Sequence, residues 1–427
     1  MQTHFTEAQL GDPALQEANR ILRSCVHCGM CQSACPTYQL LGDERDGPRG
    51  RIYLIKDMLE NDRPATPELT VHLDRCLSCL SCMTACPSGV NYMHLIDLAR
   101  ARIEDTVTRP PAERALREFL AVLLPRPGLF RMAVAVAALL RPISAKLPAR
   151  LRGLFLALPA RRPRLLPSRL AIPAPAPAER RRRVALLTGC VQPVLAPEIN
   201  AATVRLLARH GCEVVVAAGS GCCGALTHHL GKEEAALASA RANIDAFERL
   251  IEKGGLDAIV VDASGCGTMV KDYGFLLRLD PEYAEKAARI SALARDVTEI
   301  IDEIGLIRNG SGGGAGMRIA YHSACSMQHG QRLHALPKRL LEAAGFQVQD
   351  VPEGHLCCGS AGTYNLLQPE LAGQLRSRKL AQIESLQSEA VATGNIGCLL
   401  QIGGGTKIPV LHTAQLLDWA TGGPRPF

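Results

Sequence analysis

Apolar residues follow two different periods along this chain. In the first hundred residues they recur at helical spacing, as in 51–59 and 93–103, which predicts a small helical domain. From residue 184 on, short strand-like segments such as 184–187 and 257–263, the latter with the apolar centre AIVV, alternate with longer helical stretches. Because strands that alternate with helices form parallel sheets, the second half of the chain is predicted to be α/β.

The second half is an internal duplication. Residues 183–190 align with 318–325, and each segment ends in a cysteine. In both copies 32 positions separate this cysteine from a Cys-Cys-Gly, and a Gly-Cys closes the unit, at Cys266 and at Cys398. A spacing kept this closely predicts two related units, each with three strands.

The length of 427 residues predicts more than one domain. We place a helical domain at 1–108, a basic insert and linker at 109–183, the first repeat at 184–309 and the second at 317–421. The segment 309–316, NGSGGGAG, lies between the repeats. It lacks the Gly-Lys-Ser/Thr of a phosphate-binding loop, and its composition predicts a flexible linker.

Positive charge is concentrated in the insert, where 109–183 holds 17 Lys and Arg against three Asp and Glu. Its apolar patches at 119–124 and 153–158 are framed by arginine, as in helices that lie on anionic membrane surfaces. The apolar run Met132–Leu140 is shorter than the roughly 20 residues that span a bilayer. We expect contact with a membrane surface or a partner subunit; the alternative is a solvated linker. Few aromatic residues and no recognition motif argue against nucleic acid.

Eight cysteines form two runs, CVHCGMCQSACP and CLSCLSCMTACP, with the spacing of bacterial two-cluster ferredoxins. In that pattern three thiolates of a run bind one [4Fe-4S] cluster and the fourth binds the other. The spacing therefore predicts one cluster on Cys25, Cys28, Cys31 and Cys86, and a second on Cys76, Cys79, Cys82 and Cys35. Structural zinc is the alternative, but zinc sites usually pair two CxxC elements.

The repeats carry a second cysteine set, which we expect at the carboxyl ends of the strands. Its members are Cys190, Cys222, Cys223 and Cys266 in the first copy, and Cys325, Cys357, Cys358 and Cys398 in the second. The N-terminus has no secretory signal pattern, which predicts a reducing compartment and disfavours disulfides. Three interpretations stay open: additional iron-sulfur clusters, a redox-active vicinal dithiol, or buried cysteines that only pack.

Several histidines lie near these motifs, namely His228, His229, His322, His329 and His355. A ligand or acid-base role is conceivable for each, but a lone histidine at a strand end is more often structural. We assign no catalytic residue to this chain.

The cysteine runs, the stretch LLGDERDGPRGRIYLIK, the ASGCG around Cys266 and the segment 354–364 together resemble the iron-sulfur subunits of bacterial glycolate oxidase, also called glycolate dehydrogenase. The resemblance implies an oxidoreductase complex in which FAD-bearing partner subunits oxidise glycolate to glyoxylate, with D-lactate to pyruvate a further reaction. This chain would carry the electrons to membrane quinone, with no flavin of its own. It implies a cytoplasmic protein, peripheral on the inner membrane.

The wider CCG-domain family includes subunits of heterodisulfide reductases, anaerobic glycerol-3-phosphate dehydrogenase and lactate-utilisation proteins. The alternative function is therefore that of such a subunit, with redox chemistry at the CCG cysteines. Family members with noncubane clusters close each copy with CxxC, whereas this chain has Ala263 and Asn395 at the first of those positions. This departure argues against a five-thiolate site in either repeat.

Overall fold

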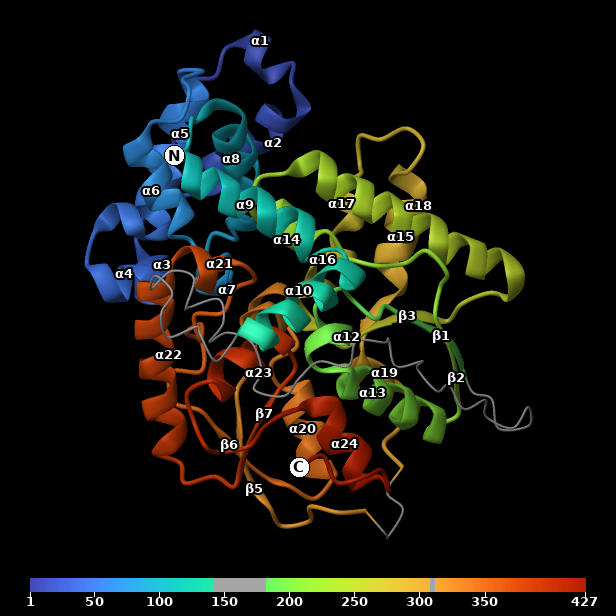
Figure 1. Cartoon of the computed structure of the whole chain (residues 1–427). Helices are drawn as coiled ribbons and strands as arrows, with labels where there is room; N and C mark the ends of the chain where they lie inside the picture. Colours follow the sequence, from blue (N-terminus) through green and yellow to red (C-terminus); the bar gives the residue numbers. More distant parts are fainter. Residues whose placement is uncertain (141–181, 308–311) are drawn as a thin grey trace.

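A computed structural model describes residues 1–140, 182–307 and 312–427. A helical N-terminal part lies against two α/β units (Figure 1). Its helices are α1 (Glu7–Leu10), α2 (Pro13–Ser24), α3 (Met30–Ser33), α4 (Pro36–Leu41), the 3-10 turn η1 (Glu44–Asp46), α5 (Pro48–Glu60), α6 (Pro67–Asp74), α7 (Ser81–Thr84) and α8 (Tyr92–Thr106).

Proline and side-chain caps set the starts of several of these helices. Asp12 caps α2 and Thr66 caps α6, each followed by a proline at the first helical position, where the missing N–H has no intrahelical partner to lose. Buried apolar side chains of α2, α5, α6 and α8 form one core, which includes Ile55 and Leu95. Groups bound at the cysteines that border this core would add to the stability of the domain.

Two further helices, α9 (Pro111–Leu123) and α10 (Pro127–Leu140), follow this core. Figure 1 shows them running from the N-terminal helices across the α/β units. Their inner face buries Leu120, Phe130 and Val134 against Val194 of the first repeat. Among the described residues, no single helix is long and apolar enough to cross a membrane. The pair α9 and α10 reaches that length together but is bent by 118°. The patch 153–158 and the linker before residue 182 lie outside the described residues.

The first repeat contains β1 (Arg182–Leu186), α12 (Gln192–Leu195), α13 (Pro197–Arg209), β2 (Cys212–Val215), α14 (Ala225–His229), α15 (Glu233–Gly254), β3 (Ala258–Val261), α16 (Ser264–Lys271), α17 (Tyr273–Leu276), α18 (Ala284–Leu293), β4 (Ala294–Asp296) and α19 (Val297–Ile304). The second contains β5 (Arg318–Tyr321), the π-helical turn η4 (Ser326–Gly330), α20 (Leu336–Ala343), β6 (Gln347–Asp350), α21 (Tyr364–Leu367), α22 (Pro369–Glu384), β7 (Ala390–Thr393), α23 (Ile396–Gly403), β8 (Val410–His412) and α24 (Thr413–Ala420).

Each repeat forms its own parallel sheet, ordered β2-β1-β3-β4 and β6-β5-β7-β8. The predicted α/β class and duplication are confirmed. Each sheet has one strand more than we predicted, because β4 and β8 are only three residues long. Such short pairings leave almost no alternation in the sequence to detect.

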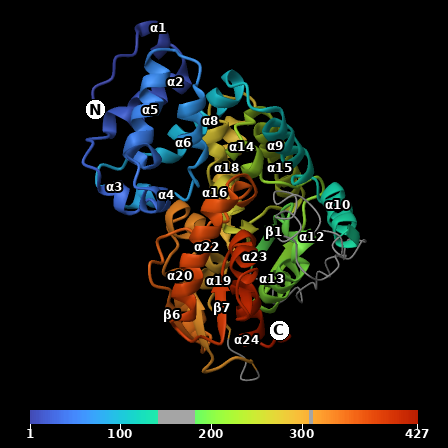
Figure 2. The same ribbon diagram turned by 60° about the vertical axis from the view of Figure 1, so that its left-hand side comes forward.

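The two repeats share one hydrophobic core, seen side by side in Figure 2. Helix α13 packs on α24, and α19 packs on α20. Because α13 and α20 hold equivalent places in the two copies, as do α19 and α24, the contact is approximately two-fold symmetric. At its edge Asp418, only 1% exposed, forms ion pairs with Arg205 and Arg209 at 2.6 and 2.9 Å.

The described end of the glycine-rich linker, residues 312–316, packs against the second repeat. A side chain at Gly312 or Gly313 would overlap Ala420 or the Trp419 ring. A Cβ at Gly314, where φ is +83°, would lie 2.6 Å from the Phe346 ring. Glycine is therefore required here because the backbone approaches the end of the second repeat too closely for a Cβ.

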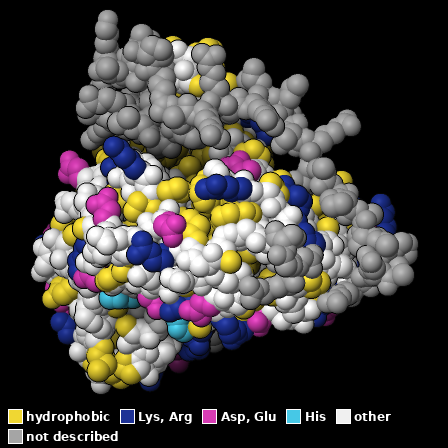
Figure 3. Space-filling view, turned by 90° about the horizontal axis from the view of Figure 1, so that it is seen from below, with side chains coloured by type: hydrophobic (Ala, Val, Ile, Leu, Met, Phe, Trp, Pro, Cys, Tyr) yellow, Lys and Arg dark blue, Asp and Glu magenta, His cyan; other side chains and the backbone are white. Residues whose placement is uncertain are grey.

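Both signs of charge occur on the face of the molecule that lies at the bottom of Figure 1. Figure 3 shows Lys and Arg side chains interspersed with Asp and Glu among hydrophobic ones on the described part of this face. On the described part of this face the two signs of charge are interspersed and form no continuous basic stripe.

The N-terminal helices meet the first repeat through buried ionisable groups. The Asp97 carboxylate lies 3.3 Å from His228 Nε2 and 3.4 Å from His229 Nδ1. Burial works against a charged imidazole at His228, but the charge of Asp97 outweighs it, and the pKa of His228 is raised. Burial likewise opposes ionisation of Asp97, but His228 reverses this and lowers the carboxyl pKa. The interface therefore holds an ion pair at neutral pH.

We expect His228→Gln to destabilise the protein more at pH 6 than at pH 9. A raised folded pKa means that the stabilisation by His228 is complete below its unfolded pKa of about 6.5, and is lost as pH rises through the folded value. Asp97 contributes above about pH 4 and loses its contribution only as pH falls through its lowered pKa. Denaturant unfolding should show a loss of about 1–2 kcal/mol at pH 6. The exposed His334→Gln is the control, and an equal loss at both pH values would contradict the assignment.

Candidate metal centres

The two N-terminal cysteine runs fold into the same tight turn. His27 and Gly29 have positive φ angles of 56° and 82°, and Ser78 and Leu80 repeat this with 50° and 62°. The left-handed conformation is unfavourable for leucine, so the surrounding structure must hold Leu80 in place. One short helix follows each turn, α3 in the first run and α7 in the second. Each turn thus holds three cysteines close together and sends the fourth away along the chain.

Two cavities result, each lined by cysteines of both runs. The cysteines of the first cavity are Cys25, Cys28, Cys31, Cys82 and Cys86. Those of the second cavity are Cys35, Cys76, Cys79 and Cys82. The structure therefore brings together both sets of four that the spacing predicts, with Cys82 in the wall between the cavities.

The thiols fit an iron-sulfur cluster in chemistry as well as position. Burial raises the pKa of Cys31 to about 11, and the neighbouring Cys25 and Cys86 add to the effect. Burial also raises the pKa values of Cys79 and Cys82. Crowded thiols that resist ionisation lose their protons when a cationic cluster binds, because thiolate is the ligand form. The surrounding walls are largely apolar, as at Ile52 and Val90.

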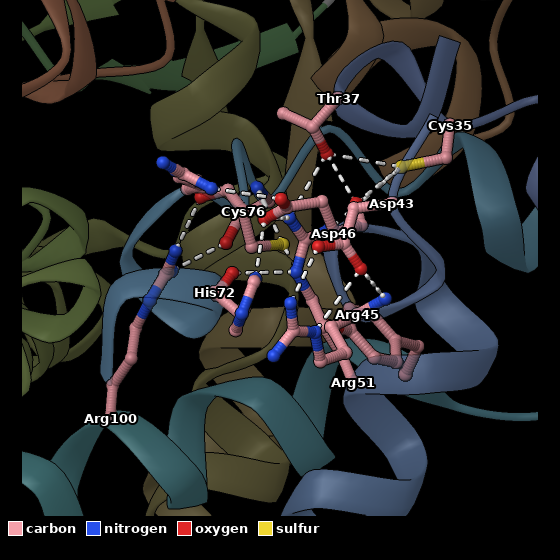
Figure 4. Close-up of polar contacts among 12 residues, drawn as sticks. Cys35, Thr37, Asp43, Arg45, Asp46, Arg51, His72, Cys76 and Arg100 are labelled. Atoms are coloured by element: carbon pink, nitrogen blue, oxygen red, sulfur yellow. Dashed lines mark hydrogen bonds and ion pairs between the residues drawn. The ribbon is translucent and has the colours of Figure 1, made fainter. Parts of the chain in front are cut away.

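A buried ionic network adjoins the second cavity, whose lining includes Thr37 and Arg51. Figure 4 shows its polar contacts. Arg51 is 1% exposed and donates to the His72 carbonyl at 2.8 Å and to Thr37 Oγ1 at 3.0 Å. Its Nη1 lies 3.8 Å from the sulfur of Cys35. Asp46, also buried, accepts from His72 Nδ1 at 3.0 Å and from Arg75 at 2.9 Å. The network fixes a positive charge beside one wall of the cavity.

The charge of Arg51 is maintained in spite of its burial. Burial opposes the guanidinium charge, but Cys76, Tyr92, Cys35 and Asp46 together raise the pKa of Arg51. The backbone of Cys76 is held as well, since Arg100 donates to its carbonyl at 2.6 Å. Groups that donate toward a cluster sulfur raise its reduction potential, so Arg51 is positioned to tune this site.

Sequence reasoning did not select Arg51, Asp46 or His72 as site residues. His72 lies four residues before Cys76, whereas Asp46 and Arg51 lie in LLGDERDGPRGRIYLIK, a stretch noted above only for its resemblance. Its glycines give a second signal, because a side chain at Gly47 or Gly50 would overlap Gln32 or the Glu44 backbone. Close packing of this loop places Asp46 under the cysteines.

In the repeats, all eight cysteines follow the carboxyl ends of strands, as predicted. In the first repeat, thiol contacts join Cys190 to Cys222, Cys222 to Cys223, and Cys223 to Cys266. Hydrogen bonds from Cys190 and Cys223 lower the pKa of Cys222 to about 4. In the second repeat, the same chain of contacts joins Cys325, Cys357, Cys358 and Cys398. Each copy thus presents four neighbouring sulfurs.

The structure explains why a glycine follows the cysteine pair in each Cys-Cys-Gly. Gly224 and Gly359 have φ values of +90° and +88°, and each donates its N–H to the first sulfur of its pair at 3.4 Å. A Cβ at Gly359 would lie 2.6 Å from the Ala372 carbonyl, and one at Gly224 would lie 2.9 Å from that of Ala236. Only glycine satisfies both the left-handed backbone and the close approach.

Asn395 and Ala263 stand where the closing CxxC would have its first cysteine, and neither takes over the role of a metal ligand. Asn395 caps α23 by accepting from Gly397 N at 2.7 Å, and it donates to Ser264 Oγ at 2.9 Å. Ala263 precedes α16 and offers no donor atom. The structure therefore contains no fifth thiol at these positions.

The second cavity of the N-terminal domain adjoins the cysteines of the second repeat. Cys79 and Leu77 pack with Cys325, Cys357 and Tyr364 in one hydrophobic cluster. The two sites also interact electrostatically. Burial is the main cause of the raised pKa of Cys79, and the neighbouring Cys325 raises it further. Cysteine sites of two domains are thus in direct contact.

Two thiol-lined cavities in a helical domain, joined to a duplicated cysteine-rich α/β unit, define an iron-sulfur electron-transfer protein. Family models agree: residues 21–90 match a 4Fe-4S dicluster domain, and residues 184–271 and 319–403 match a cysteine-rich domain called CCG. The chain belongs to the family of glycolate oxidase iron-sulfur subunits. It is 46% identical to the "Glycolate oxidase iron-sulfur subunit" of Escherichia coli (strain K12) over 98% of this chain and 99% of that protein.

Other relatives extend the similarity. The "Probable glycolate oxidase iron-sulfur subunit" of Bacillus subtilis (strain 168) is 30% identical over 94% of each chain. "Lactate utilization protein A" of Geobacillus thermodenitrificans (strain NG80-2) is 28% identical over 55% of this chain and 98% of its own length. A crystal structure of a hypothetical protein from Helicobacter pylori shares the fold, with a TM-score of 0.54 and 11% identity over 99% of this chain and 74% of that one.

Proposed function

We propose that this chain holds two [4Fe-4S] clusters on crossed cysteine sets. Cys86 joins Cys25, Cys28 and Cys31 at the first cavity, and Cys35 joins Cys76, Cys79 and Cys82 at the second. The observation that carries this assignment is that each fourth cysteine lines the cavity of the other run. When bound, the clusters supply one-electron redox chemistry.

We further propose that the electrons come from FAD-bearing partner subunits that oxidise glycolate to glyoxylate, with D-lactate as a second substrate. The names of the two full-length relatives support this assignment. So does the exposure of the first cavity. Cys28 is exposed there, between Val26 and Met30, which are 66% and 60% exposed. Exposed apolar side chains around a redox site are suited to docking a partner.

The test is glycolate-dependent reduction of the purified chain. Under anaerobic conditions, catalytic amounts of the flavin subunits and glycolate should bleach its visible absorbance, whereas glycolate alone should not. Met30→Gln should slow the bleaching, with the exposed Leu279→Gln as a matched control on another surface. Bleaching by dithionite but not by glycolate with the flavin subunits would contradict this function.

We propose that the protein is cytoplasmic, lies on the cytoplasmic face of the inner membrane, and passes electrons to quinone there. Helices α9 and α10 support this, because their outer face exposes Phe119, Met132, Val136 and Leu139 while their inner face packs on the protein. Leu139 is 69% exposed. An apolar outer face close to Arg126 and Arg131 suits the interface of an anionic membrane.

The double variant Met132→Gln/Leu139→Gln should weaken binding to vesicles of phosphatidylglycerol and phosphatidylcholine. Loss of two inserted apolar side chains is expected to lower the binding at least about tenfold. Vesicle co-sedimentation measures the effect, and Leu279→Gln serves as the control. Unchanged vesicle binding would contradict the membrane contact, and loss of binding to the flavin subunits alone would assign this face to a protein partner instead.

A further inference from the structure

The two repeats differ at a buried position beside their sulfurs. His322 directly follows β5, where Leu187 directly follows β1 in the first repeat. The positions are equivalent in hydrogen bonding, since Leu187 N donates to Val260 and His322 N to Ala392 on the neighbouring strand. A hydrophobic side chain in one copy therefore corresponds to an imidazole in the other.

At a second buried position, too, the first repeat has a neutral side chain and the second repeat has an ionisable one. The contacts of Gly224 with Ala236 and of Gly359 with Ala372 set helix α15 in register with α22. In this register Lys379 corresponds to Asn243. Asn243 is neutral and donates to the Cys222 carbonyl. Lys379 is 2% exposed, donates to the Glu353 carbonyl at 2.8 Å, and faces Cys325, Cys357 and Cys358.

The side chain of His322 lies at the sulfur site of the second repeat. It is fully buried, and neither ring nitrogen has a hydrogen-bond partner in the described part of the chain. One of its nitrogens and the sulfurs of Cys358 and Cys398 all lie within 4.8 Å of one another. An imidazole buried without a partner loses the hydrogen bonds that water would provide, which is a substantial penalty unless a ligand occupies the site.

We propose that the second repeat holds an iron-sulfur cluster with His322 as its nitrogen ligand, beside Cys358 and Cys398. The remaining thiolates are supplied by Cys325 and Cys357, which continue the chain of sulfurs. Imidazole takes the place of the fifth thiolate that the closing CxxC would provide. The first repeat, with Leu187, offers no such nitrogen.

The ligand set gives this centre a place in the electron path, an inference that rests on the proposed electron-transfer function. Neutral imidazole ligands raise the potential of an iron-sulfur centre relative to thiolates, and the charge of Lys379 acts in the same direction. The site adjoins the second N-terminal cavity through Cys79, Leu77 and Tyr364. Electrons from that cavity are therefore expected to pass to the second repeat in preference to the first.

The test is pulsed EPR on the full chain, purified anaerobically and reduced with dithionite. A ¹⁴N coupling to one reduced centre is expected, replaced by a ¹⁵N coupling after labelling of histidine. His322→Leu, which copies the first repeat, should abolish it. His322→Cys should abolish it too, keep the iron, and shift one centre to a lower potential in a redox titration. His355→Gln, an exposed histidine of the same repeat, should leave the signal intact.

Three results would overturn this assignment: a ¹⁴N coupling that survives in His322→Leu, zinc in place of iron in the second repeat, or no metal beyond the N-terminal clusters. Dithionite replaces the flavin partner in this experiment, so its outcome is independent of the glycolate assay. A chain that fails to accept electrons from glycolate could still show the coupling, and the two proposals can therefore fail separately.

Discussion

Cys35→Ala is expected to remove the cluster of the second cavity and leave that of the first. The expectation follows from the crossing, because Cys35 belongs to the first run in sequence but lies with Cys76 and Cys79 in space. The purified variant should contain about half of the iron that the N-terminal domain otherwise binds, since one of its two [4Fe-4S] clusters is lost. Glycolate-driven reduction should then stop at the first centre. Iron analysis and EPR of the reduced variant measure both effects.

The reciprocal variant is the control. Cys86→Ala, in the second run, should remove the centre that includes Cys25, Cys28 and Cys31, and it should preserve the other. The EPR signals lost in the two variants should be complementary. If Cys35→Ala instead destroys the signal shared with Cys28→Ala, ligation follows the sequence runs and is not crossed.

Arg51→Met is expected to lower both the stability of the protein and the potential of the second-cavity centre. Removal of the guanidinium breaks the hydrogen bonds to His72 and Thr37 and leaves Asp46 less compensated in a buried site. Loss of one partner of a buried ion pair costs about 3 kcal/mol of unfolding free energy. The positive charge beside Cys35 favours the reduced, more negative cluster, so its loss should make that centre harder to reduce.

Two measurements check this prediction, denaturant unfolding and a redox titration followed by EPR. Arg51→Lys keeps the charge but not the planar donor geometry, so it should retain more of the potential than of the stability. Arg49→Met, on the same helix but with its ion pair at the surface, should change the free energy of unfolding by less than about 1 kcal/mol. A potential unchanged in Arg51→Met would remove the tuning role from this network.

Features that depend on the spacing of cysteines could be predicted from the sequence alone. Cysteine intervals predicted the crossed sets that the two cavities bring together, and the matched interval of the repeats predicted their duplication. The same spacing located Cys358 and Cys398 at strand ends. Ligand sets of this kind are local, because a turn of a few residues fixes three of four members.

Partners brought together by the tertiary fold were beyond the sequence. Arg51 and Asp46 read as ordinary charged residues of an amphipathic stretch, and only packing shows that both are buried beside Cys35. His322 could have been noticed as a histidine where the other repeat has Leu187, but its unpartnered nitrogens needed the structure. The contact between Cys79 and the second repeat depends on how two domains dock, which no periodic pattern records.

Iron and acid-labile sulfide, measured on anaerobically purified protein, test the central claim that this chain carries electrons on cysteine-bound clusters. About eight irons and eight sulfides per chain are predicted for the N-terminal pair alone, and a higher count if the second repeat is filled as well. The protein should be brown. A colourless chain with zinc and no sulfide would contradict the account.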